Sequence, residues 1–280
     1  MDTRLIELGC YFRHQAAWPT AAVFQVTAAG SDRVRVSDAR WSVEPNVPLH
    51  HYTDTFGNTC TRLELPSGVS VVEYHSLATV PDAIDEAEES APEIPAATLP
   101  DDVLVYTLAS RFCQPDELGR HAWRLFADVP TGWSRVQAIC TWVHEYLVYT
   151  TGSTVPTSTS VDAFSSGVGV CRDFAHLMIT MCRALNIPAR YAFGYLPDVD
   201  VAPNPTPMDF HAWVQVWLGD RWWDFDPRHN NRRKGRVQIG QGRDAADAAM
   251  VTTYGAPWLQ LMTVTAREVV QEPTPSVPTV

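Results

Sequence analysis

Apolar and polar residues alternate along much of the first third of the chain, the pattern of strands with one buried face. Residues 21–28 and 33–45 follow this period of two and contain several β-branched side chains. Residues 61–80 form two further alternating runs on either side of Ser67 and Gly68, which predicts a hairpin. Several short antiparallel strands so close together predict a small N-terminal β-sandwich.

The alternation stops at a stretch of different composition. Residues 81–102 are rich in Asp, Glu, Ala and Pro and show no apolar period, so we interpret them as a linker. We therefore expect an N-terminal β-sandwich domain at residues 1–95 and a second domain at residues 96–265. Residues 266–280 are polar and proline-rich and are expected to form a tail without stable structure.

The second domain begins with a helical period. A helix is expected from Pro115, and a second one within residues 132–150, where apolar residues share one face: Val136, Ile139, Cys140, Val143 and Leu147. Residues 151–170 are expected to form a polar loop. A third helix should begin at Cys171 and end before Pro188, since proline cannot continue it.

After this helix the period returns to two. Residues 190–196, 211–218 and 221–227 each read as a strand, and Gly219 with Asp220 forms the turn between the last two. Helices followed by antiparallel strands place the second domain in the α+β class.

The charge of the chain excludes one class of function. The 280 residues carry a formal net charge of -11, and the pI is about 5.2, whereas general nucleic-acid binding requires positive charge. The basic run from Arg228 to Arg236 is interpreted as a solvated loop. No apolar run is long enough to cross a bilayer and the first residues lack a signal-peptide core, so no membrane partner and a cytoplasmic location are expected.

The cysteines show no paired spacing. They are Cys10, Cys60, Cys113, Cys140, Cys171 and Cys182. Without C-x-x-C pairs, neither a disulfide framework nor a zinc site is favoured, and no metal or other cofactor is expected.

Cys171 is the candidate nucleophile. It stands in the first turn of its helix, where unpaired backbone N–H groups and the helix dipole favour a thiolate. Gly169 would let a substrate backbone approach the thiol closely. The alternative is an ordinary core cysteine, as we assume for Cys140 and Cys182.

The two strands after the helix supply a candidate base and its partner. With a two-residue turn, Leu218 lies opposite Arg221, and Trp213 lies opposite Asp226. His211 then becomes the diagonal neighbour of Asp226 on the same face, within reach of a hydrogen bond. A carboxylate that orients an imidazole is what a general base needs. Trp213 shares this face and could wall the substrate site.

The motifs around these residues resemble the core of the bacterial transglutaminase-like superfamily, whose members are often named as cysteine proteases. G-x-C ends at Cys171, H-A-W begins at His211, and W-x-x-x-D-P contains Asp226. The resemblance implies a papain-like fold, with a cysteine-bearing helix packed on an antiparallel sheet that carries the histidine and the aspartate. It also implies a catalytic triad of these three residues and a preceding β domain. Many relatives have threonine where this chain has Arg228.

The triad predicts thiol-dependent chemistry on amide bonds of a peptide or protein, through a thioester. We favour hydrolysis, by a peptidase or amidase, because the chain shows no acidic loop of the kind that calcium-dependent transglutaminases need. Acyl transfer to an amine and a silent binding or scaffold module are the alternatives. A metal site formed by Cys171, His211 and Asp226 is a third. The second oxyanion donor is left open among Ser165, Tyr149 and other upstream residues.

Overall fold

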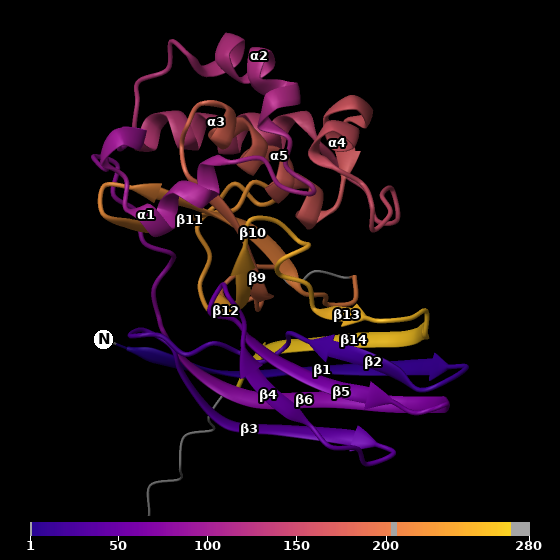
Figure 1. The fold of residues 1–280 in the computed structure, drawn as a ribbon. Helices are drawn as coiled ribbons and strands as arrows, with labels where there is room; N and C mark the ends of the chain where they lie inside the picture. Colours follow the sequence, from indigo (N-terminus) through magenta and orange to yellow (C-terminus); the bar gives the residue numbers. More distant parts are fainter. Residues whose placement is uncertain (1, 203–205, 270–280) are drawn as a thin grey trace, which may run out of the picture.

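The computed structural model describes residues 2–202 and 206–269. In Figure 1 the helices gather at one end, a sheet lies beneath them, and two further sheets lie at the other end. The three sheets of this described part are four-stranded and antiparallel. A short parallel pair, β7 and β8, lies apart from them.

Two of the sheets are built mainly from the N-terminal part of the chain. The first has the order β14-β1-β6-β3, and its strands are β1 (Thr3–Ala16), β3 (Arg35–Glu44), β6 (Gly68–Pro81) and β14 (Trp258–Glu268). The second has the order β13-β2-β5-β4, and its strands are β2 (Thr20–Phe24), β4 (His50–Thr53), β5 (Thr59–Leu65) and β13 (Val251–Thr253). The rings of Phe12 on β1 and Phe24 on β2 meet between the sheets, 5.4 Å apart.

The predicted hairpin at Ser67 and Gly68 is wrong. β5 and β6 follow each other directly, but β5 pairs with β2 and β4, whereas β6 pairs with β1 and β3. Each strand alternates because one of its faces is buried, and this pattern does not specify the neighbouring strand. The long strand β1 was not anticipated from the sequence.

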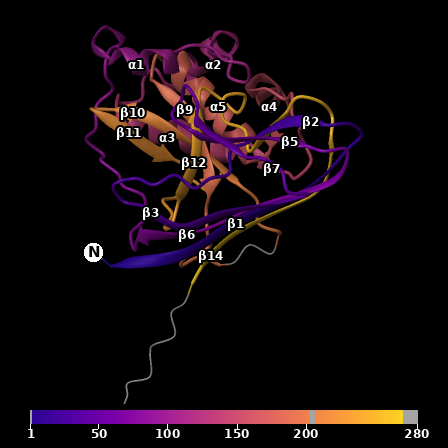
Figure 2. The same ribbon diagram turned by 60° about the horizontal axis from the view of Figure 1, so that its bottom comes forward.

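Strands from the C-terminal part complete both sheets. β13 pairs with β2, and β14 runs beside β1 for most of its length, as Figure 2 also shows. Residues 251–253 and 258–265, which were expected in the second domain, therefore pair with N-terminal strands, and so do residues 266–268 of the expected tail. Residues 270–280 lie outside the described part. Independent folding of residues 1–95 as a β-sandwich domain stays a prediction.

The third sheet and the helices form the part that carries the predicted site. The sheet has the order β11-β10-β9-β12, and its strands are β9 (Ala189–Tyr195), β10 (His211–Leu218), β11 (Arg221–Phe225) and β12 (Val237–Gly242). The main helices are α2 (Pro115–Phe126), α3 (Trp133–Tyr146) and α5 (Cys171–Ala184). α5 packs on β9 and β10 and is almost entirely buried. The expected α+β arrangement of a helix on an antiparallel sheet is therefore present.

The expected loop at residues 151–170 contains regular structure. It holds α4 (Ser160–Ser166), which Thr159 and Asp162 cap reciprocally, and β8 (Val168–Gly169), which pairs with β7 (Val148–Tyr149). A helix of seven residues is too short to show a clear apolar period. Short helical turns also occur at α1 (Asp101–Leu104), Ala96–Thr98 and Val105–Thr107. None of the described helices is both long and apolar enough to cross a membrane.

Ion pairs join the acidic linker, residues 81–102, to the basic run, residues 228–236. Lys234 contacts Asp82 at 2.6 Å, and Arg236 contacts Asp85 at 3.1 Å. The backbone N–H of Arg233 also donates to the Asp85 carboxylate. Arg233 and Arg236 are nearly inaccessible to solvent, so the interpretation of this run as a solvated loop is wrong. Opposite charges far apart in sequence neutralise each other beside the third sheet.

Candidate active site

Cys171 lies at the first residue of α5, and a buried carboxylate organises that end of the helix. Asp173 Oδ2 accepts hydrogen bonds from the Val170 N–H and from Thr154 Oγ1, both at 2.8 Å. A Cβ atom on Gly169 would lie 2.7 Å from the Cβ of Asp173. Glycine at 169 is therefore required to admit this carboxylate. The predicted contact between Gly169 and a substrate stays a prediction, because Gly169 does not line the cavities beside Cys171.

Cys171 is also the accessible thiol. All six cysteines are free and lie in the described part, and only Cys171 is not buried. Burial raises the pKa of Cys10 and of Cys113 to about 12 and raises the pKa of the others, Cys60, Cys140 and Cys182. A thiol-directed reagent should therefore distinguish Cys171 from the rest.

His211 and Asp226 meet as the strand pairing predicts. Leu218 pairs with Arg221 and Val214 pairs with Phe225, which is the expected register. His211 Nε2 lies 2.7 Å from Asp226 Oδ2, and both side chains are buried. Burial lowers the pKa of His211, but the Asp226 carboxylate and the neighbouring Cys171 sulfur outweigh it, so the pKa is raised. Burial also opposes ionisation of Asp226, and His211 with Arg236 overcomes it and lowers the Asp226 pKa.

Arg236 is a third partner, one that the sequence did not reveal. Its NH2 group lies 3.3 Å from the same Asp226 oxygen that binds His211, and 3.1 Å from Asp85 Oδ2. The guanidinium also stacks over the Trp213 ring at 4.6 Å. The run around Arg236 resembles any basic loop, so no local signal marks this residue.

Trp213 supports the imidazole from the side. The two rings are nearly parallel, with centroids 6.5 Å apart, and Trp213 Nε1 donates to Asp224 Oδ1 at 2.7 Å. Trp213 is only 1% exposed and does not line the cavities at Cys171. Trp213 therefore contacts both the imidazole and the Arg236 guanidinium, and its predicted role as a wall of the substrate site stays a prediction.

A loop after β11 holds Asp226 from its other side. The His229 N–H donates to Asp226 Oδ1 at 3.2 Å, and the Asn230 N–H donates to the Asp226 carbonyl oxygen at 2.7 Å. From α3, Gln137 donates to the Asn230 side chain, and His144 Nδ1 donates to the Arg228 carbonyl oxygen. The position of the carboxylate is therefore fixed by α3 as well as by the sheet.

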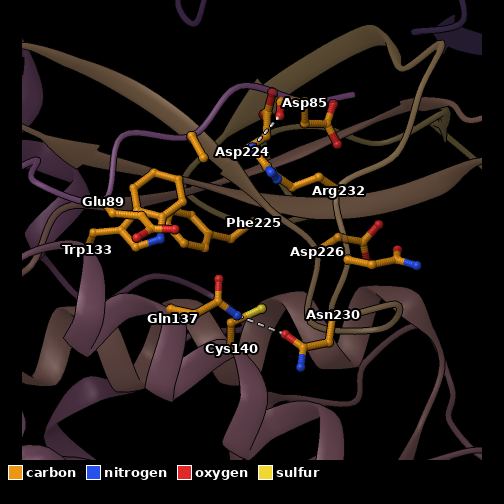
Figure 3. Close-up of a pocket in the computed structure, with 12 residues that line it drawn as sticks. Asp85, Glu89, Trp133, Gln137, Cys140, Asp224, Phe225, Asp226, Asn230 and Arg232 are labelled. Atoms are coloured by element: carbon orange, nitrogen blue, oxygen red, sulfur yellow. Dashed lines mark hydrogen bonds between the residues drawn. The ribbon is translucent and has the colours of Figure 1, made fainter. Parts of the chain in front are cut away.

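Figure 3 shows the small pocket behind this carboxylate. It measures about 330 Å³, and Asp85 and Asp224 lie on one side of it while Gln137 and Cys140 of α3 lie on the other. Neither Cys171 nor His211 lines this pocket. The pocket therefore lies on the far side of Asp226 from the Cys171 thiol.

A metal ion could bind near Asp226 only if it displaced hydrogen bonds that this carboxylate already makes. His211, Asp226 and His229 can bring one ligand atom each within 4.8 Å of one another. Burial lowers the pKa of His229 to about 4, which leaves a neutral imidazole at neutral pH. However, Asp226 Oδ2 already binds His211 Nε2 and Arg236. A metal ion would have to displace the imidazole proton and sit beside a buried guanidinium, so this set fits a metal poorly.

Two cavities meet at Cys171. They share Val170, Cys171, Asp209, Phe210 and His211. The first cavity, of about 670 Å³, is walled mainly by apolar side chains; we call it the apolar cavity. The second, of about 560 Å³, carries charged and polar groups from Asp198, Arg228, His229 and Arg233; we call it the polar cavity. A chain that crosses both would pass over the thiol.

Known proteins share this core. Residues 119–227 match the family model of the transglutaminase-like superfamily. An uncharacterized protein of Mycobacterium leprae is 38% identical over 117 residues, which are 41% of this chain and 42% of that relative, so the match spans less than half of the relative's length.

Two solved structures extend the comparison. The structure of a "Putative Cysteine Protease from Cytophaga hutchinsonii" superposes with a TM-score of 0.86 at 28% identity, over 100% of this chain and 95% of that one. The periplasmic domain of TgpA from Pseudomonas aeruginosa gives a TM-score of 0.42 at 16% identity, over 80% of this chain and 88% of that one. Residues 119–227 therefore form a core that matches the transglutaminase-like superfamily, within a chain that has the same overall fold as the Cytophaga protein.

Proposed function

We propose that the protein is an amide hydrolase in which Cys171, His211 and Asp226 act as nucleophile, base and orienting carboxylate. The observation that carries this proposal is the 2.7 Å contact between His211 Nε2 and Asp226 Oδ2 at the point where the accessible thiol opens into two cavities. Because Nε2 donates to the carboxylate, Nδ1 is left to exchange a proton with the thiol. The name of the Cytophaga relative agrees with this chemistry.

The reaction proceeds in two steps. The Cys171 sulfur attacks the carbonyl carbon of an amide, its proton passes to His211, and the C–N bond breaks as the imidazolium protonates the leaving amine. A thioester remains on the sulfur. His211 then takes a proton from a water molecule, whose oxygen attacks the thioester carbon, and the C–S bond breaks to release the acid and the thiol. Asp226 stabilises the imidazolium in both steps.

The backbone N–H of Cys171, the first residue of α5, supplies one side of the oxyanion site, since the first N–H groups of a helix have no partner within it. Tyr149 is the upstream side chain that supports a second donor best. It lines the polar cavity beside Cys171, and the Arg228 guanidinium lies 4.0 Å from the centre of its ring. β7 brings it there by pairing with β8, where Tyr149 lies opposite Gly169. Ser165 and Ser166 belong to α4 and line neither cavity at Cys171.

Thiol labelling tests the nucleophile without knowledge of the substrate. Iodoacetamide near neutral pH should alkylate Cys171 far faster than the five buried cysteines, as mapped by peptide mass spectrometry. His211→Ala should slow this labelling, and His50→Ala, at an exposed position on β4, serves as the matched control. Equal slow labelling of all six thiols would contradict the proposal and favour a binding module.

Peptide libraries decide between hydrolysis and acyl transfer. Both reactions pass through the same thioester, so the triad does not distinguish them. Incubation of the protein with mixed peptides and a soluble primary amine should give cleaved peptides, whose fragments together contain one added water, or deamidated peptides, in which water has replaced ammonia. Products that gain the amine instead would show a transferase, and a Cys171→Ala variant sets the background.

A further inference from the structure

The apolar cavity beside Cys171 is lined mainly by carbon atoms. Its apolar lining consists of Phe112, Val155, Pro156, Val170, Tyr191, Phe193, Phe210, Ala245, Ala246, Ala248, Ala249, Met250 and Val251. Its volume, about 670 Å³, falls in the range of roughly 300–1,000 Å³ that is usual for small-molecule sites. Both the thiol and the imidazole of the proposed reaction lie in its wall.

The charged side chains in its wall are few. Arg172 Nη2 donates to the Val155 carbonyl oxygen at 2.9 Å and lies 3.6 Å from Asp173 Oδ1, whereas Arg172 Nε has no hydrogen-bond partner in the described part of the chain. Asp209 is exposed and lies at the end that the two cavities share. A charged substrate group placed deep among the apolar side chains would lose its water and find few partners, which is costly.

Residues 245–251 form one wall of the cavity. This wall is anchored to the rest of the protein at both ends. At one end the Ala245 N–H donates to His176 Nε2 at 3.1 Å. At the other end the Met250 carbonyl oxygen accepts from the Gln25 N–H at 3.0 Å, and Val251 pairs with Phe24 of β2. The N-terminal sheets therefore shape the cavity through β13, which they hold in place.

We infer that this cavity binds an apolar group of the amide substrate, such as a leucine or phenylalanine side chain or a short acyl chain, beside the carbonyl that Cys171 attacks. The inference rests on the proposed function, since it takes Cys171 as the attacking atom. The polar cavity on the other side of the thiol then receives a hydrophilic part of the same substrate, because Arg228 and Asp198 line it. The substrate is thus apolar on one side of the reacting bond and polar on the other.

Chloroacetamides with N-alkyl tails of increasing length test this assignment. The tail should enter the apolar cavity while the sulfur displaces chloride, so the rate of labelling at Cys171 should rise from N-ethyl to N-hexyl. Each buried methylene contributes up to about a fourfold gain. The readout is the ratio of the N-hexyl rate to the iodoacetamide rate, which cancels differences in thiol reactivity.

Ala249→Leu should reduce this ratio, because Ala249 is half-buried in the cavity wall and a larger side chain occupies the space of the tail. Ala17→Leu, at an exposed position between β1 and β2, is the matched control and should keep the ratio of the unmodified protein. A ratio that does not depend on tail length, with Cys171 still labelled by iodoacetamide, would overturn the apolar assignment alone. Failure of iodoacetamide to select Cys171 would instead overturn the proposed function.

Substrate preference gives an independent check. Peptide amides with leucine or phenylalanine before the reacting bond should be turned over at least tenfold faster than those with glutamate or lysine there, a difference of about 1.4 kcal/mol or more. Equal turnover of both sets would contradict the inference.

Discussion

Replacing Arg236 by methionine is expected to raise the pKa of His211. Arg236 and His211 both bind Asp226 Oδ2, at 3.3 and 2.7 Å, so their nitrogen atoms are at most about 6 Å apart. The guanidinium stabilises the carboxylate but repels the imidazolium that the same carboxylate holds. Removal of this repulsion favours the protonated ring.

The magnitude follows from Coulomb's law. Two unit charges about 6 Å apart interact by roughly 3 kcal/mol at an effective dielectric constant of 20, which corresponds to about two pKa units. Relaxation and water entry reduce the effect, so we expect the His211 pKa to rise by about one to two units. The fold also loses a partner for the buried carboxylate of Asp226 and the partly buried one of Asp85, at a cost of about 3–5 kcal/mol.

Histidine NMR titration measures this pKa directly, with the His211 signal assigned by its loss in His211→Ala. Arg236→Lys keeps a cation and should restore most of the original pKa, which guards against a variant that is too unstable to titrate. Arg267→Met removes an exposed guanidinium paired with Glu7 and should leave the His211 pKa unchanged. An unchanged or lower His211 pKa in Arg236→Met would refute the electrostatic account of this cluster.

The remaining predictions concern the carboxylate, the loop glycine and pH. Asp226→Asn should lower the His211 pKa and slow iodoacetamide labelling of Cys171 by at least about tenfold, and an unchanged rate would remove Asp226 from the proposed mechanism. Gly169→Ala should destabilise the protein by about 1–3 kcal/mol in urea unfolding, because its Cβ would collide with Asp173; a loss below about 0.5 kcal/mol would show that the loop adapts. Because folding raises the pKa of His211, its pairing stabilises the fold fully below about pH 6.5 and less as pH rises through the folded pKa. The stability difference between the unmodified protein and His211→Gln should therefore shrink at alkaline pH.

The contact between His211 and Asp226 could be predicted because it is local. A two-residue turn joins β10 to β11, and the register of such a hairpin follows from the length of its loop. Fifteen positions separate the two residues, and the same face of one hairpin carries both. The start of α5 at Cys171 could be predicted for a similar reason, since the glycines before the helix and the apolar spacing within it are local signals.

The roles of Gly169 and Trp213 illustrate the limit of such signals. The sequence shows that a glycine precedes the cysteine but not which group fills the space of its missing side chain, and here Asp173 fills it. It also shows that Trp213 shares the face of His211, but not that the Arg236 guanidinium stacks over the Trp213 ring. Both residues lie where they were expected, and only the tertiary structure shows the groups that contact them.

By itself, the sequence determined the main elements of the second half, the register that joins imidazole and carboxylate, and the position of one thiol at a helix start. Only the tertiary structure decided which strands pair in the N-terminal sheets, because an alternating pattern shows that one face of a strand is buried but does not specify the neighbouring strand. It alone also brought Asp85 to Arg236 across 151 positions and β13 to β2, so that distant segments complete the charge cluster and the cavity wall. Such contacts depend on the packing of the whole chain, since no short stretch contains both partners.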